Sequence, residues 1–231
     1  MKKKYEDIED IKDVILIHGL YQNTLIMRVL GYRLEKLGYQ VHYFKYPTLI
    51  TSFEKNVDSF CHYLERFSSP FAIIGHSLGS LIILKSLEKS ISQQLKRVIA
   101  ITPPFHGSRI VQYLTDHNAS FLIGKSQNVL LPNYNRYWKF PIPLGIIAGT
   151  HNQGPTSLLL ESITDTIDKD SLVGDGTVYL DETKLEGYSD FITLNRSHSM
   201  ILFDPKTASL CDLFIKHALF KPSKKVISNH Q

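Results

Sequence analysis

The sequence has few cysteines, no long apolar run and no basic stripe. Its 231 residues include two cysteines, Cys61 and Cys211, and both have bulky neighbours in helix-like patterns. This pattern favours buried free thiols over a disulfide framework. No apolar run approaches the length of a membrane span. Because no basic stripe is interleaved with aromatic residues, the sequence also argues against a nucleic-acid partner.

The chain lacks the apolar segment that follows the basic residues of a signal peptide. Lys2–Lys4 run directly into a polar, mostly acidic stretch over residues 5–10, and together with the free thiols this favours a soluble cytoplasmic protein. The net charge is +4, and part of the excess lies at the two ends of the chain. Short basic ends are usually solvated tails, and a weak attraction to anionic lipid surfaces is the alternative interpretation.

The composition and the element pattern indicate one α/β domain over residues 1–231. Hydrophobic residues make up 43% and charged residues 21%, which is enough apolar material for a sizeable core. No linker, repeat or low-complexity stretch divides the chain. Short apolar runs of strand type are expected at 14–17, 41–44, 71–75, 97–101, 142–149 and 191–194. Helical spacing is expected at 22–37, 53–67, after residue 79, at 157–172 and at 207–219. This alternation predicts a mainly parallel central sheet flanked by helices.

The pattern Gly-x-Ser-x-Gly occurs at Gly75–Gly79, between an apolar strand and an apolar helix. In that context it is typical of a nucleophile elbow, in which a tight turn lifts Ser77 above the end of the strand. Glycines on both sides allow the close packing that the turn needs. The pattern alone is weak evidence, and its structural alternative is an ordinary glycine-containing loop.

An acyl-transfer reaction needs two backbone N–H groups that stabilise an oxyanion. The residue after the serine, Leu78, supplies one candidate. The first strand ends in His18-Gly19-Leu20, and Leu20 is the natural second candidate, with Tyr21 next. We interpret His18 as a structural histidine that holds this loop, in preference to a chemical role.

A serine nucleophile also needs a base and a carboxylate that orients the base. Asp175, between two glycines, is expected near the carboxyl end of the strand at 142–149, and His198 follows the last strand. In a parallel sheet these ends meet at one edge, so Ser77, Asp175 and His198 are predicted to come together. The competing bases and acids, each less suited by its position, are His76, His106, His151, Asp165, Asp168, Asp170, Asp181 and Asp190.

Residues 109–140 lose the regular alternation and carry many aromatic and aliphatic residues. Two interpretations stay open: an irregular helical excursion that packs on its own body, or a cap over the serine, extending over about 105–140, that forms an apolar acyl pocket. Tyr21, His76 and Phe105 are expected to contact the substrate.

Together these motifs resemble the α/β-hydrolase superfamily, and within it the small lipase- and esterase-like members. The stretch that includes Thr102-Pro103 and Gly107-Ser108 resembles one in bacterial lipases and in a lipase-like group related to enzymes that deacylate lipid anchors. The sequence departs from the family pattern at two places. Its first strand begins early in the chain, which predicts a minimal fold without the leading antiparallel strands. After His18-Gly19-Leu20 it has Tyr21-Gln22-Asn23, where bacterial lipases have a further glycine.

The resemblance implies a carboxylic-ester hydrolase that acts on a small-molecule or lipid acyl ester, with no metal and no organic cofactor. An acyltransferase or thioesterase with the same triad is the alternative, and a non-catalytic binding protein is the third. The acyl chain, the acceptor and the oligomeric state are not determined by the sequence.

Overall fold

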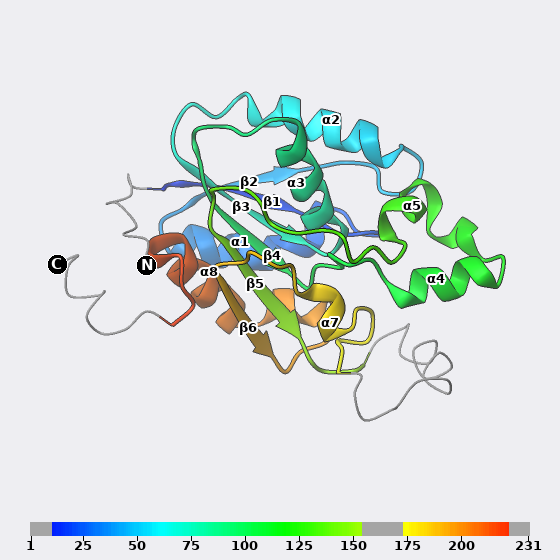
Figure 1. The fold of residues 1–231 in the computed structure, drawn as a ribbon. Coiled ribbons are helices and arrows are strands. Elements are labelled where there is room, and N and C mark those ends of the chain that lie inside the picture. Colours follow the sequence, from blue (N-terminus) through cyan, green and yellow to red (C-terminus); the bar gives the residue numbers. More distant parts are fainter. Residues whose placement is uncertain (1–10, 154–172, 222–231) are drawn as a thin grey trace.

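Six parallel strands form the centre of the fold in the order β2-β1-β3-β4-β5-β6. The computed structural model describes residues 11–153 and 173–221. The strands are β1 (Asp13–Ile17), β2 (Gln40–Phe44), β3 (Phe71–His76), β4 (Leu95–Ile101), β5 (Leu144–Gly149) and β6 (Asp190–Leu194). Because every pair is parallel, the carboxyl ends of all the strands point to one edge of the sheet (Figure 1). Within the described residues the sheet has no antiparallel strand.

Helices cover both faces of this sheet (Figure 1). On one face lie α1 (Arg28–Lys36) and α8 (Pro205–His217), and on the other lie α2 (Phe53–Leu64) and α3 (Leu78–Lys89). Beyond the carboxyl ends of the strands lie α4 (Arg109–Asp116), α5 (Gln127–Leu130) and α7 (Leu180–Thr183). The short 3₁₀ segments are η1 (Thr24–Met27), η2 (Ser120–Leu122), η3 (Gly124–Ser126) and η5 (Met200–Phe203).

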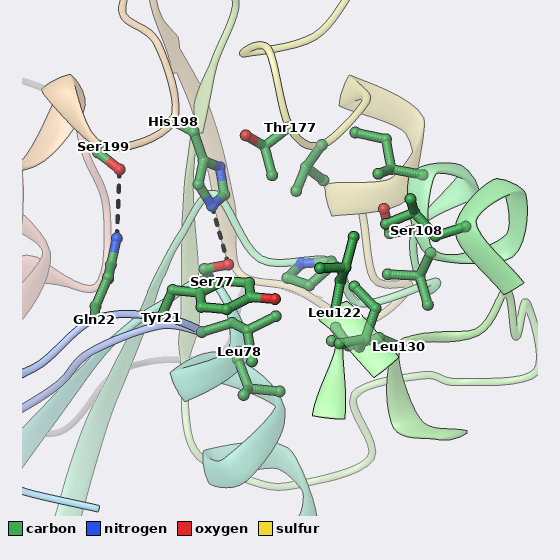
Figure 2. A pocket seen from close by; sticks show the side chains of 17 residues that line it. Tyr21, Gln22, Ser77, Leu78, Ser108, Leu122, Leu130, Thr177, His198 and Ser199 are labelled. Atoms are coloured by element: carbon green, nitrogen blue, oxygen red, sulfur yellow. Dashed lines mark hydrogen bonds between the residues drawn. The ribbon is translucent and has the colours of Figure 1, made fainter. Parts of the chain in front are cut away.

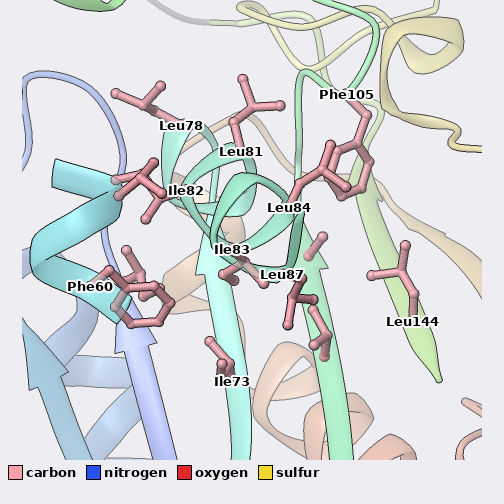
Figure 3. Packing of buried hydrophobic residues seen from close by; sticks show 14 of the residues in the cluster. Phe60, Ile73, Leu78, Leu81, Ile82, Ile83, Leu84, Leu87, Phe105 and Leu144 are labelled. Carbon is pink, nitrogen blue, oxygen red and sulfur yellow. The ribbon is translucent and has the colours of Figure 1, made fainter. Parts of the chain in front are cut away.

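Alternate residues of each strand supply the two apolar layers. Ile73 faces the layer under α2 and α3, whereas Ile74 faces the layer under α1 and α8. Helix α3 is apolar on nearly all sides because it packs against the sheet, α2 and the segment after β4 (Figure 3). Phe60 of α2 is fully buried there, and burial of such a side chain contributes about 1.5–3 kcal/mol. The helix that begins at Leu78 is therefore firmly held.

The structure corrects three details of the predicted elements. The helix predicted over 22–37 begins as the 3₁₀ segment η1 and becomes α-helical at Arg28. Helix α7 was not among the predicted helices, and at its start the carboxylate of Glu182 accepts the backbone N–H of Tyr179. The last helix begins at Pro205. Proline is tolerated at the first position because the N–H of that residue would have no partner within the helix. The helix predicted at 157–172 lies outside the described residues.

The segment predicted as a cap contains α4, η2, η3 and α5, with no strand between Arg109 and Leu130. Among the described residues, no helix is long and apolar enough to cross a membrane.

Candidate active site

Ser77 occupies a strained turn between β3 and α3. Its φ is 51° and its ψ is −123°, a conformation that residues with a side chain rarely adopt. The backbone N–H of Ser77 donates to the carbonyl oxygen of Ile101, which holds the turn against β4. A Cβ on Gly79 would lie 2.7 Å from the carbonyl oxygen of Ile17, so only glycine lets α3 begin this close to β1. The turn places the hydroxyl at the carboxyl edge of the sheet.

Asp175 and His198 form a hydrogen-bonded line with this hydroxyl. The Nδ1 of His198 lies 2.7 Å from Oδ2 of Asp175, and its Nε2 lies 3.0 Å from Oγ of Ser77. The other carboxylate oxygen, Oδ1, accepts the N–H groups of Thr177 and Val178 at 3.0 and 2.8 Å. A carboxylate that accepts at Oδ2 places the imidazole proton on Nδ1, so the lone pair of Nε2 faces the serine.

The loop after β1 lies directly against the serine. A Cβ on Gly19 would come within 2.9 Å of Cβ of Ser77, so the backbone here approaches as closely as glycine allows. The N–H of Tyr21 donates to Oγ1 of Thr48. The N–H groups of Leu20 and Leu78, in contrast, make no hydrogen bond to the rest of the described chain. Of the two residues considered for the second donor, Leu20 is therefore the one with an N–H left for a ligand.

A mostly apolar pocket opens beside Ser77 (Figure 2). It encloses about 470 Å³, a size typical of small-molecule sites. Its apolar lining comes from the two predicted donor residues and from the segment after β4, α4, η2 and α5. The lining residues are Leu20, Tyr21, Gln22, Ser77, Leu78, Pro104, Ser108, Ile110, Val111, Leu114, Leu122, Ile123, Leu130, Thr177, Val178, His198 and Ser199. The predicted cap thus supplies one wall of this pocket.

Solved structures of similar fold are lipases and other hydrolases. The mature lipase BlEst2 of Bacillus licheniformis has a TM-score of 0.67 and 14% identity, over 92% of this chain and 94% of that chain. The phospholipase PlaB from Legionella pneumophila has a TM-score of 0.65 and 15% identity, over 90% of this chain and 57% of that chain. An extracellular α/β-hydrolase from a Paenibacillus species has a TM-score of 0.56 and 15% identity, over 89% and 98%. The chain has the α/β-hydrolase fold.

At such low identity the likeness shows the fold alone. No protein-family model matches the sequence, and no curated protein matches it. The predicted fold class is confirmed, since the sheet is parallel, helices flank it and its structural neighbours are α/β-hydrolases.

The structure does not place His76 or Phe105 in the pocket lining. Phe105 is buried in the apolar core cluster that also contains Leu84 (Figure 3), and it is not among the residues that line the pocket. His76 is fully buried behind the serine of this α/β-hydrolase fold, with Nδ1 2.9 Å from Oε1 of Gln22 and Nε2 2.9 Å from the carbonyl oxygen of His198. Tyr21, the third residue expected to contact the substrate, does line the pocket.

His18 occupies the structural position that the sequence favoured. It is fully buried, stacks on Tyr46, and its Nδ1 lies 3.1 Å from the carbonyl oxygen of Gly19. The hydroxyl of Tyr46 donates to the carbonyl oxygen of His18. Burial lowers the pKa of His18, which favours a neutral ring at neutral pH.

Glu182 is a buried residue whose role the sequence gave no signal for. Its two carboxylate oxygens accept the N–H groups of Arg109, at the start of α4, and of Tyr179, at 2.7 and 2.9 Å. It therefore joins the pocket wall to the loop that carries Asp175. Burial raises the pKa of Glu182 to about 7. Tyr179 is neither serine nor threonine, so its spacing to Glu182 does not give the capping-box pattern, and the bond of Glu182 to a distant helix depends on the folded structure.

Within the described residues, no cluster of three or more His, Cys, Asp or Glu side chains could hold a metal ion.

The buried His76 predicts a loss of stability in acid. Burial, followed by the nearby His198, lowers the pKa of His76 from 6.5 to about 3. In the unfolded chain this imidazole therefore takes up a proton near pH 6.5, whereas in the folded chain it stays neutral until about pH 3. Unfolding in denaturant at a series of pH values should show the wild type losing stability relative to His76→Asn as the pH falls from 6.5 to about 3, by an amount on the order of 4 kcal/mol.

Both proteins keep Glu182, so its own titration cancels in this comparison. Stability curves that run parallel over the whole pH range would show that His76 is not held neutral.

Proposed function

We propose that this chain is a serine hydrolase that cleaves carboxylic esters through an acyl-enzyme intermediate. The observation that carries the proposal is the line of hydrogen bonds from Asp175 through His198 to Ser77, at 2.7 and 3.0 Å. This line lies at the mouth of an apolar pocket, beside two N–H groups that have no hydrogen-bond partner among the described residues. The arrangement meets the geometric requirements of acyl transfer.

In the first half of the reaction, Oγ of Ser77 attacks the ester carbonyl carbon while Nε2 of His198 takes its proton. The carbonyl oxygen becomes an oxyanion, which accepts hydrogen bonds from the N–H groups of Leu20 and Leu78. The carbon–oxygen bond to the alcohol then breaks, and His198 returns the proton to the leaving oxygen. Asp175 keeps the imidazole oriented and stabilises its positive charge.

In the second half, a water molecule replaces the alcohol. His198 takes a proton from the water as its oxygen attacks the acyl carbon. The bond to Oγ of Ser77 breaks, the serine recovers its proton from His198, and the carboxylic acid leaves.

The pocket and its rim indicate a substrate with an alkyl chain. Its apolar side chains suit an acyl group rather than a charged one. Tyr21 and Leu122 line the pocket yet expose 60% and 44% of their surface. An apolar rim of this kind supports esters of low solubility, including lipid esters, as substrates.

Labelling with a fluorophosphonate probe tests the proposed nucleophile. Intact mass should show one adduct on the wild type and none on Ser77→Ala, because only an activated serine attacks phosphorus. Ser90→Ala, at the exposed end of α3, should label as the wild type does. Folded wild-type protein that does not react, with or without detergent, would contradict the proposal. Products formed from an ester in the presence of an added alcohol would reveal an acyltransferase.

The pocket wall predicts how chain-length preference should change. Val111 lines the pocket from α4, whereas the next residue, Gln112, is exposed on the outer side of the helix. Val111→Phe should reduce kcat/KM for a long acyl ester by about tenfold relative to a short one, because the lost pocket volume excludes methylene groups. Gln112→Phe should leave the ratio unchanged. Equal ratios for both variants, measured with a graded series of p-nitrophenyl esters, would show that the acyl chain lies elsewhere.

A further inference from the structure

Gln22 lies where three loops of the site meet. Its side-chain Oε1 accepts the N–H of Gly19 at 2.9 Å, and its Nε2 donates to Oγ of Ser199 at 3.3 Å (Figure 2). The same Oε1 lies 2.9 Å from Nδ1 of His76. One half-buried side chain thus contacts the loop after β1, the residue before the serine and the residue after His198.

Gln22 holds both peptide units that meet at Gly19: its side chain binds the N–H of the His18–Gly19 peptide, and its backbone N–H binds the carbonyl oxygen of the Gly19–Leu20 peptide at 3.3 Å. That carbonyl and the N–H of Leu20 belong to one planar peptide, and no described peptide bond is cis. In a trans peptide the two groups point in opposite directions. The backbone N–H of Gln22 holds this carbonyl and so sets the direction of the Leu20 N–H, while the side chain of Gln22 fixes the preceding peptide and limits rotation at Gly19.

His76 extends this contact to the base. Its Nε2 lies 2.9 Å from the carbonyl oxygen of His198, on the opposite side of the ring from Gln22. The neutral ring of His76 has one N–H and donates to one of these two oxygens, and Gln22 also reaches the histidine loop directly through Ser199. A displacement of Gln22 would therefore alter both the donor loop and the histidine loop.

We propose that Gln22 is a positioning residue that aims the Leu20 N–H at the oxyanion of the reaction. The inference rests on the proposed ester hydrolysis and adds to it a residue that never touches the reacting carbon. Gln22 lies in the stretch Tyr21-Gln22-Asn23, where bacterial lipases have a further glycine. Its side chain stabilises this loop through the N–H of Gly19.

Variants of Gln22 test the proposal through the kinetics of an aryl ester. Gln22→Ala removes the side-chain contacts and, because the site borders the pocket, leaves space that water can fill. Gln22→Met keeps the bulk and removes the amide. Each should lower kcat by about 10- to 100-fold while KM changes by less than about threefold, because an oxyanion donor acts in the transition state.

A second readout separates positioning from general loosening of the structure. A thiono ester carries sulfur in place of the carbonyl oxygen, and sulfur is a weaker hydrogen-bond acceptor. The wild type should prefer the oxo ester over its thiono analogue, and both Gln22 variants should lose most of this preference. Asn23→Ala removes a neighbouring exposed side chain that only caps η1, and it should keep both the rate and the preference.

The outcomes distinguish the two proposals. A wild type that neither hydrolyses the ester nor reacts with the fluorophosphonate overturns the proposed function, and the role of Gln22 with it. A wild type that does both, with a folded Gln22→Ala or Gln22→Met whose kcat stays within about twofold, overturns the role of Gln22 alone. A lower kcat with an unchanged oxo-to-thiono ratio overturns it as well. Thermal unfolding of each variant establishes which of them is folded.

Discussion

The tight turn at Ser77 is the constraint on which the site depends. The serine can hold a φ of 51° only because β3 is buried along its whole length and α3 is packed on nearly all sides. Backbone strain of this kind costs on the order of 1–3 kcal/mol and persists where the surroundings determine it. Gly79 and Gly19 then let the β1 strand and its loop close against the turn. Nucleophile, helix N-terminus and donor loop are therefore set by the same packing.

The second feature of the site is a set of polar side chains that join its loops to one another. Gln22 and His76 join the donor loop to the histidine loop, and Glu182 joins the acid loop to α4. Their titrations act in opposite directions. His76, with a depressed pKa, contributes stability that is lost as the pH falls from 6.5 to about 3. Glu182, with a pKa raised from 4.5 to about 7, contributes stability that is lost as the pH rises through that range.

Chain order and strand patterns predicted much of this arrangement, because parallel strands bring their carboxyl ends to one edge whatever the loop details. The proximity of Ser77, Asp175 and His198 follows from that rule. The contacts of the Gln22 and Glu182 side chains could not be predicted in this way, because each side chain joins segments that are far apart in the chain and meet only in the folded structure. His76 and Phe105 were expected to contact the substrate. Strand and loop geometry instead turns both into the interior.

A crystal structure of the fluorophosphonate-treated protein would test the account most directly. We expect phosphorus bonded to Oγ of Ser77, with the phosphoryl oxygen about 2.7–3.1 Å from the backbone nitrogens of Leu20 and Leu78. The contacts of Gln22 to Gly19 and His76 should persist in that adduct. An adduct on another residue, or a phosphoryl oxygen that points away from both N–H groups, would contradict the proposed chemistry.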